Sequence, residues 1–301
     1  MRIIDAHAHV FEKAAGITKQ APLSPDRNGR MRIGSRLEQF MPPSFEQSNS
    51  TVETLLSYMD WAGIEKAILM SNVLYGYTND YYADAVCKNP QRFKGVAAVN
   101  FIKGREAADE LQQLYDTTPL IGLKLETDSI FQCTPGRRMT ESEYDSVWEC
   151  VSANHQPVFL HLFRSYELED AMTLIRRYPG TPFFLCHMGA DSCFGRDSNL
   201  KNYRGLLDFA EEHQNVYFDT SYVPSYFDEE YPFPSSIAAI MEAYRCVGPE
   251  RILWATDYPG SLKYATIFQQ IDMIKKHCNI PEKEMKLIMG ENAERLFFME
   301  E

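Results

Sequence analysis

The sequence predicts an α/β protein, a single (β/α)8 TIM barrel over residues 1–301, on the strength of three observations. Short apolar segments alternate with segments of helical periodicity from residue 51 to the end, which is typical of a parallel sheet covered by helices. The count of strand segments is eight, the number that closes such a barrel. Histidine and aspartate residues stand where several strands end, which is where barrel enzymes carry their chemistry.

The first strand is expected over Arg2–Val10, and it ends in two histidines, His7 and His9. Alternate residues of a strand point to the same face, so both imidazoles can reach one cation. Asp5 has the same parity and is expected on that face as well. Taken alone, the pair is equally compatible with a solvated strand end, so the rest of the chain has to decide.

Residues 11–50 are expected to form a long, lid-like loop after the first strand, because this stretch is rich in Gly, Pro, Ser and Arg. Asn28-Gly29 predicts a hairpin turn within it. The arginines of this loop are interpreted as solvated, with contact to a substrate carboxylate as the alternative. They are Arg27, Arg30, Arg32 and Arg36.

Strands and helices are then expected in strict alternation. Further strands are expected at residues 66–71, 95–100, 121–125, 157–161, 182–187, 216–220 and 251–256. Helices are expected at residues 51–63, 77–88, 105–115, 141–153, 167–178, 200–213, 235–246 and 264–278, with two short ones at 282–289 and 291–298. Asn89-Pro90 and Pro179-Gly180 mark two of the helix ends, because proline cannot continue a helix.

Polar residues at the strand ends predict a divalent-metal site. His161 ends the fifth strand, His187 ends the sixth and Asp257 follows the eighth, so these residues meet His7 and His9 on one rim. Imidazole nitrogen and carboxylate oxygen together suit Zn2+, with Mn2+ or Fe2+ as alternatives. The ligands do not settle whether one metal or two are bound.

Several further residues are candidates for contact with the substrate or the ligands. Lys124 ends the fourth strand and is interpreted in three ways: it extends to the rim, it binds a substrate carboxylate, or it is carbamylated and bridges two metals. Arg164 and Tyr258 are also assigned to substrate binding. Asp219 ends the seventh strand and is expected to hydrogen-bond a metal ligand.

Composition excludes several classes of partner. A net charge of −12 argues against nucleic acid, whose phosphates are bound by Lys and Arg. No apolar run approaches the roughly 18 residues of a membrane span, and no signal peptide is expected. A small anionic substrate stays compatible with a local basic pocket, and a homo-oligomer stays an open alternative. The seven cysteines, an odd number without a Cys-x-x-Cys pair, predict a reducing cytoplasm.

Six short motifs spread over the whole chain are specific in combination: Ile4–His9, Gly122–Leu125, His161, His187–Gly189, Thr256–Pro259 and Met289–Phe297. With these motifs the chain resembles the amidohydrolase superfamily, and more narrowly its amidohydrolase 2 group of metal-dependent barrels. The group includes hydrolases of lactones and related cyclic esters, and non-oxidative decarboxylases and hydratases of aromatic or unsaturated acids. The resemblance implies that His7, His9, His161 and Asp257 bind one divalent metal and that His187 orients the water or the substrate.

Two positions depart from the pattern of the group. Gly260 stands where decarboxylase-like members often carry a histidine or an aromatic residue, and Glu126 stands where many members have a histidine. The first departure favours hydrolysis.

The expected function is therefore metal-dependent hydrolysis of a lactone, ester or amide carbonyl in a small carboxylated substrate. Asp257 would act as general base on a metal-activated water, and His187 would help to polarise the carbonyl. One alternative is a metal-dependent decarboxylase of an aromatic or unsaturated acid. A second alternative is a catalytically idle metal-binding barrel.

Overall fold

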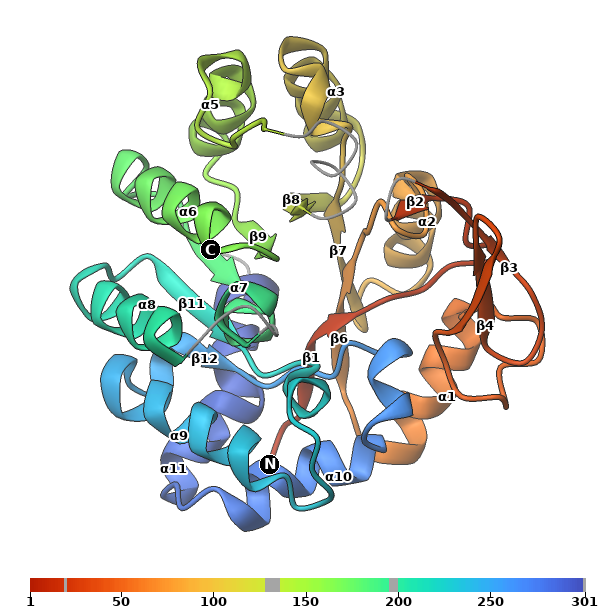
Figure 1. The fold of residues 1–301 in the computed structure, drawn as a ribbon, viewed down its shortest axis with the longest axis vertical. Helices are drawn as coiled ribbons and strands as arrows, with labels where there is room; N and C mark the ends of the chain where they lie inside the picture. Colours follow the sequence, from red (N-terminus) through yellow and green to blue (C-terminus); the bar gives the residue numbers. More distant parts are fainter. Residues whose placement is uncertain (19–20, 128–135, 195–199, 300–301) are drawn as a thin grey trace.

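The computed structural model describes residues 1–18, 21–127, 136–194 and 200–299. Its centre is a parallel sheet of eight strands in the order β1-β6-β7-β8-β9-β10-β11-β12, which follows the order along the chain. The helices surround these strands (Figure 1). The strands are β1 (Ile4–Ala8), β6 (Lys66–Met70), β7 (Phe93–Ala97), β8 (Leu120–Glu126), β9 (Val158–His161), β10 (Phe183–Leu185), β11 (Val216–Asp219) and β12 (Ile252–Leu253).

Backbone hydrogen bonds between the first strand and the residues after β12 close the barrel. The amide of Ala6 donates to the carbonyl of Trp254 at 3.1 Å, and the amide of Asp257 donates to the carbonyl of His7 at 2.8 Å. Ala8 forms a parallel bridge with Tyr258. The predicted eight-stranded barrel is confirmed, although regular pairing in the last strand ends earlier than expected.

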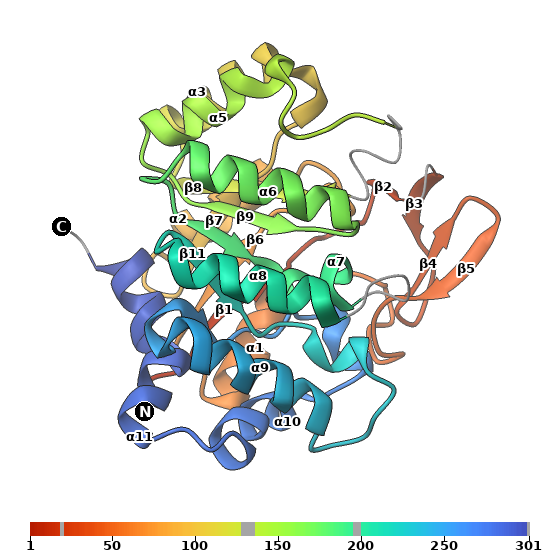
Figure 2. The same ribbon diagram turned by 60° about the vertical axis from the view of Figure 1, so that its left-hand side comes forward.

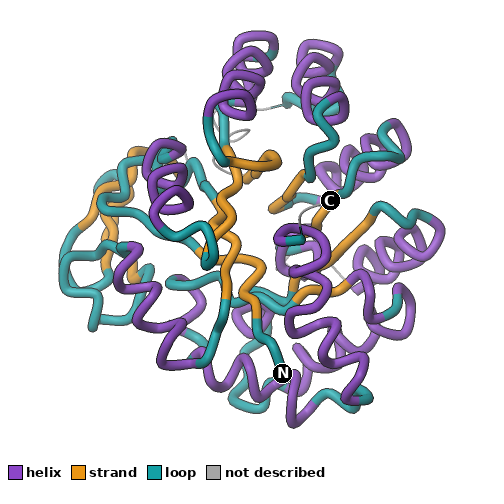
Figure 3. Tube along the Cα trace, turned by 180° about the vertical axis from the view of Figure 1, so that it is seen from behind, coloured by secondary structure: helices purple, strands orange, loops and turns teal. Residues whose placement is uncertain are grey.

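Helices form the outer layer, and the view from behind shows them around the central strands (Figure 3). Their ends follow local chemistry: α1 begins where the Thr51 hydroxyl accepts from the amide of Thr54, and it ends at Gly63, whose φ is +72°. The α-helices are α1 (Val52–Ala62), α2 (Asn79–Lys88), α3 (Arg105–Thr117), α5 (Asp145–Ala153), α6 (Ser165–Arg177), α7 (Asp191–Phe194), α8 (Leu200–Glu212), α9 (Pro234–Val247), α10 (Ile267–Asp272) and α11 (Glu282–Lys286).

The helices near the end of the chain are more broken than the periodicity predicts. The single helix expected at residues 264–278 is a 3-10 turn over Gly260–Lys263, then α10, then a π-helical turn over Met273–His277. The two short terminal helices likewise contain π-helical turns, at Leu287–Glu291 and Glu294–Phe298. Apolar spacing does not distinguish these closely related helical forms.

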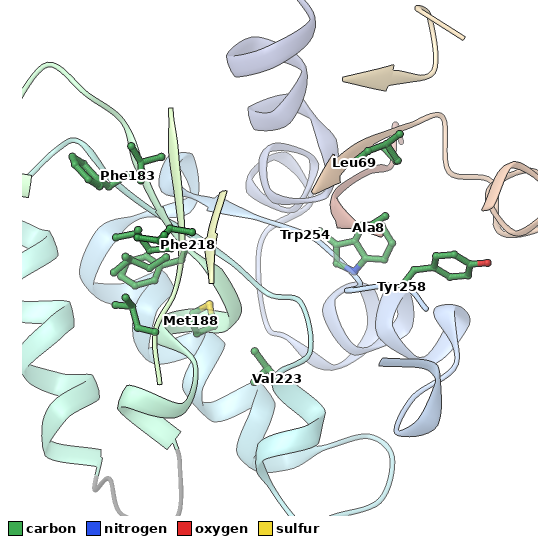
Figure 4. Packing of buried hydrophobic residues seen from close by; sticks show 14 of the residues in the cluster. Ala8, Leu69, Phe183, Met188, Phe218, Val223, Trp254 and Tyr258 are labelled. Atoms are coloured by element: carbon green, nitrogen blue, oxygen red, sulfur yellow. The ribbon is translucent and has the colours of Figure 1, made fainter. Parts of the chain in front are cut away.

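Buried apolar residues form two layers. The larger layer packs the outer face of the strands against the helices, and Leu69, Phe183, Phe218 and Trp254 belong to it (Figure 4). The smaller layer fills the barrel and includes Ile4, Ala6, Ile68, Met70, Val96, Phe159, Phe184, Leu253 and Ala255. Phe297, near the end of the chain, packs into this smaller layer.

The insertion after β1 is not the irregular loop that its composition predicts. It forms a four-stranded antiparallel sheet of β2 (Ile17–Thr18), β3 (Ala21–Pro25), β4 (Arg30–Ile33) and β5 (Arg36–Gln39). Met31 and Ile33 alternate with arginines and are buried, which is the pattern of a half-buried strand. The hairpin turn predicted at Asn28-Gly29 is confirmed, with φ of +57° and +72°. Figure 2 shows this sheet and the chain's C-terminus on opposite sides of the barrel.

Two further observations concern membrane spans and thiols. Among the described residues, no helix is long and apolar enough to cross a membrane. Six of the seven cysteines lie in the described part of the chain as free thiols, and Cys133 lies outside it. The prediction of one domain over residues 1–301 stays a prediction.

Candidate metal centre

His7 and His9 lie at the end of β1 with their imidazoles directed to one point. The register of β1 against β6 shifts between Asp5 and Ala8, so simple alternation does not hold through this stretch. The carboxylate of Asp5 accepts from the backbone amide of Thr256 at 2.9 Å and from its hydroxyl at 2.5 Å. Burial raises the pKa of Asp5 to about 7. Asp5 therefore ties β1 to the segment after β12.

Hydrogen bonds at the Nδ1 atoms fix the tautomers of His7 and His9. His9 Nδ1 lies 2.6 Å from the carbonyl oxygen of Met70, and His7 Nδ1 lies 3.0 Å from Oδ2 of Asp219. A carbonyl and a carboxylate only accept, so each Nδ1 carries the proton and each neutral ring keeps a lone pair on Nε2. The two Nε2 atoms are 3.2 Å apart. Two facing lone pairs at this distance fit a shared cation.

His187 is oriented in the same way, after β10. Its Nδ1 lies 2.7 Å from the Ser221 hydroxyl, which in turn donates to Oδ1 of Asp219. The backbone amide of His187 donates to the same Oδ1 atom at 2.9 Å. The ring of His187 stacks on that of His7 at a centroid distance of 4.9 Å. Its Nε2 is therefore also left for a ligand.

Asp257 supplies the carboxylate of the site. Its Oδ1 atom lies 3.0 Å from Nε2 of His9 and 3.4 Å from Nε2 of His7. Donor atoms of His7, His187 and Asp257 lie within 4.8 Å of one another. Asp257 and His187 both have positive φ, +62° and +56°. Strained backbone of this kind is held by its surroundings and is common at functional sites.

His161, at the end of β9, borders this group. Its Nε2 is buried and has no hydrogen-bond partner among the described residues, and it lies 3.8 Å from Oδ2 of Asp191. Its ring is perpendicular to that of His187, with centroids 4.4 Å apart. A buried imidazole nitrogen without a partner is costly unless a ligand occupies it, so this residue also fits a metal site.

Burial keeps the central imidazoles neutral. It lowers the pKa of His7 and of His187 well below the ordinary value, and the nearby Lys124 ammonium lowers that of His7 further. Metal binding requires the neutral ring. Three oriented imidazoles, a fourth without a partner and one carboxylate are a donor set that suits zinc, manganese or iron.

A pocket of about 450 Å³ opens onto this centre. His9, His161 and Asp257 form part of its wall, and the insertion contributes Thr18, Glu38, Gln39 and Phe40. The other lining residues are Asn72, Leu74, Tyr75, Glu126, Phe163, Asp191, Tyr222, Ser225, Tyr226, Gly260, Lys263 and Tyr264. The lid-like insertion therefore belongs to the pocket wall.

The residues assigned to substrate binding from the sequence do not line this pocket. Lys124 is buried and donates to the sulfur of Cys186 at 3.0 Å, so it does not extend to the rim. Arg164 is exposed at the start of α6. Tyr258 is buried in the outer apolar layer (Figure 4), and its ring lies 5.3 Å from that of Tyr58. Their contact with a substrate stays a prediction.

The four arginines of the insertion are also absent from the pocket wall. Arg30 pairs with Asp26 at 3.0 Å and Arg36 with Glu38 at 3.5 Å, with both guanidinium groups substantially exposed. The interpretation of this group as solvated fits these contacts.

Lys263 is the cation of the pocket wall, and the sequence analysis did not assign it. Its place in the loop after the eighth strand was the available signal, because such loops line barrel sites.

The fold and this donor set define a metal-dependent barrel enzyme. The chain belongs to the Amidohydrolase family (Amidohydro_2), whose sequence model matches residues 4–299. Among curated proteins, the chain is 26% identical over 262 residues to a gamma-resorcylate decarboxylase from Polaromonas sp. (strain JS666). That match covers 73% of this chain and 74% of the relative.

Three solved structures show the fold. A probable 2-pyrone-4,6-dicarboxylic acid hydrolase from Acinetobacter baumannii, with citric acid bound, has a TM-score of 0.68 at 18% identity and covers 99% of this chain and 100% of its own. A zinc-bound amidohydrolase from Burkholderia multivorans has a TM-score of 0.74 at 14% sequence identity, and the match covers 98% of both chains. A manganese-bound dihydroxybenzoic acid decarboxylase from Polaromonas sp. JS666 has a TM-score of 0.62 at 21% sequence identity, and the match covers 81% of this chain and 84% of that chain.

Proposed function

We propose that this protein is a metal-dependent, non-oxidative decarboxylase of a small aromatic carboxylic acid. The observation that carries the proposal is the pocket: six aromatic side chains line it beside His9, His161 and Asp257. Aromatic side chains favour a flat aromatic ligand through offset-stacked or edge-to-face contacts. The six are Phe40, Tyr75, Phe163, Tyr222, Tyr226 and Tyr264. The similarity to a gamma-resorcylate decarboxylase supports the same reaction.

The residues that would hold the metal are His7, His9, His161 and Asp257, with one Zn2+ as the first choice and Mn2+ or Fe2+ as alternatives. A bound divalent ion would supply a Lewis acid that orients the substrate carboxylate and an adjacent oxygen. Asp219 and Ser221 keep His7 and His187 in the tautomers that carry the proton on Nδ1 and leave the lone pair on Nε2. The protein would act in the cytoplasm on a small anionic substrate.

Asp257 is the residue assigned to proton transfer. Its carboxylate lines the pocket and touches both imidazoles of β1. In its protonated form it would donate the proton to the ring carbon that bears the carboxylate. A π electron pair of the ring forms this new C–H bond. The bond between that carbon and the carboxylate then breaks, carbon dioxide leaves, and the electron pair of the broken bond returns to the ring and restores its aromaticity. His187 is buried against the ring of His7 and would help to orient the reacting group.

The test is release of carbon dioxide from a panel of hydroxybenzoates by the metal-reconstituted protein, with the arene product measured in parallel. Asp257→Asn is expected to abolish turnover and to keep much of the metal, while Asp84→Asn, an exposed residue of α2, keeps both. The proposal fails if the metal-loaded wild type releases no carbon dioxide from any member of the panel, or if Asp257→Asn retains full turnover.

Hydrolysis is the second candidate, and the position of Asp257 favours it specifically. A carboxylate that touches the imidazoles and faces the pocket can also accept a proton from an attacking water. A panel of lactones and esters, assayed on the same preparations, separates the two reactions by their products. Absence of turnover in both panels would leave a metal-binding barrel without catalysis.

A further inference from the structure

Lys263 is the one lysine or arginine among the described residues that line the pocket. Four carboxylate side chains line the same space, those of Glu38, Glu126, Asp191 and Asp257. A cation in a wall that is otherwise acidic distinguishes anionic ligands by the number and place of their charges, because like charges at close range repel.

The place of Lys263 is at the mouth of the pocket. It is exposed and ends the 3-10 turn that follows Asp257, whereas His9 is almost fully buried on the pocket floor. A ligand whose reacting group reaches the floor can present its far end to Lys263. This orientation of the ligand rests on the proposed function, because that function places the reacting carboxylate at the metal centre.

Contacts hold the ammonium without neutralising it. Lys263 Nζ donates to the backbone carbonyl of Gln39 at 2.9 Å, and it lies 5.0 Å from the ring centroid of Tyr264 and 6.0 Å from that of Phe40. No carboxylate of the described residues lies within 4.0 Å of it as an ion-pair partner. An ammonium has three donors, so donors remain for a ligand after the bond to Gln39.

We propose that Lys263 is the specificity-determining residue of the pocket, and that it binds one carboxylate at the end of the ligand remote from the metal centre. The carboxylate of Asp191 in the pocket wall makes a third acidic group on the ligand unfavourable. The pocket thus prefers an aromatic acid with one remote carboxylate over a monoacid, and gains nothing from a triacid.

The experiment measures the Kd of three probes on metal-reconstituted protein by calorimetry: benzoate, benzene-1,3-dicarboxylate and benzene-1,3,5-tricarboxylate. We expect the diacid to bind the wild type roughly tenfold more tightly than benzoate, as a charge-assisted hydrogen bond at a partly exposed site allows. The triacid is expected to bind no more tightly than the diacid. Lys263→Met should remove the gain and Lys263→Arg should keep it, while Lys88→Met, on the outer helix α2, serves as the matched control.

Equal affinity of the wild type for benzoate and the diacid would overturn the proposal, as would a gain that persists in Lys263→Met or no binding of any probe. Because the readout is binding, it is independent of turnover. A protein that shows the Lys263-dependent preference but releases no carbon dioxide would contradict the decarboxylase function and leave the role of Lys263 intact.

Discussion

The Nδ1 atom of His7 lies 3.0 Å from Oδ2 of Asp219, a contact that joins β1 to β11 inside the barrel. The other oxygen of Asp219 accepts from the backbone amides of His187 and Ser221, at 2.9 and 3.1 Å. One buried carboxylate therefore orients two imidazoles of the candidate metal centre. Buried charge is stable when hydrogen bonds satisfy it in this way.

Replacing Asp219 with asparagine should weaken metal binding about 10- to 100-fold, the usual effect of losing a hydrogen-bonding partner of a ligand. An amide can present its N–H to His7, which would favour the tautomer with the proton on Nε2 and remove the lone pair from the metal. Competition with a fluorescent zinc chelator measures the change. Asp208→Asn, an exposed residue of α8, is the control.

Ser221→Ala is a milder companion to that variant, because it removes the hydroxyl between His187 Nδ1 and Asp219 and keeps the bonds of Asp219 to His7 and to the amide of His187. We expect a smaller loss of affinity than in Asp219→Asn. Circular dichroism establishes that both variants fold. Unchanged zinc affinity in a folded Asp219→Asn protein would show that this carboxylate does not support the ligands.

The barrel was predictable because its signal is repeated. Each apolar strand is short and each helix has its own periodicity, so errors in single boundaries leave the count of eight intact. The insertion was not predictable in the same way, because its short antiparallel strands do not alternate with helices and so repeat no signal. Buried Met31 and Ile33 alternate there with arginines, but these arginines and the nearby prolines gave the stretch the composition of a loop.

The candidate site was predictable where strand geometry dictates it. His7, His9 and Asp257 meet because strand ends share one rim of the barrel. Substrate contacts were harder to predict, because a lysine in an apolar strand can donate to any buried acceptor. The acceptor of Lys124 is the sulfur of Cys186. Lys263 lies in a loop whose path depends on tertiary packing against the insertion, which periodicity does not encode.

The thiols should differ sharply in reactivity. Burial raises the pKa of Cys186 and of Cys193 to about 12, and a thiol stays protonated below its pKa. At pH 8 only about one in ten thousand of these groups is thiolate, the reactive form. Iodoacetamide should therefore modify the exposed Cys87 in native protein and leave the other two intact, as peptide mass spectrometry can establish.

Denatured protein is the control for that labelling, since every cysteine should then react. Rapid labelling of Cys186 in the native state would contradict the burial of the barrel interior. Labelling of Cys186 alone, without Cys193, would locate the opening at the metal centre.

Phe297 should matter for stability and little for the site. Its ring lies 5.3 Å from that of Phe184 and 5.9 Å from that of Phe159, inside the smaller apolar layer. Phe297→Ala is expected to cost about 3 kcal/mol through the lost contacts and the cavity, and to lower the Tm by several degrees. Met299→Ala, at a mostly exposed position, is the control, and equal Tm values for the two variants would refute the packing role.

Metal content should be about one divalent ion per chain after reconstitution, and the double variant His7→Ala, His9→Ala should lose it. The facing Nε2 atoms of these residues, 3.2 Å apart, supply the physical reason. A second ion is not expected, because His7 Nδ1 and Asp219, which belong to the other donor group with Cys186, are already hydrogen-bonded to each other. Inductively coupled plasma mass spectrometry gives the count.

Lys124 decides between one ion and two. Its ammonium donates to the sulfur of Cys186, so this lysine is hydrogen-bonded to a thiol and not to a residue of the metal ligand set. We therefore expect Lys124→Met to keep one metal per chain. Two ions in the wild type, reduced to one or none in Lys124→Met, would instead identify this residue as a carbamylated bridge, and the mass of the intact protein would carry the added carbon dioxide.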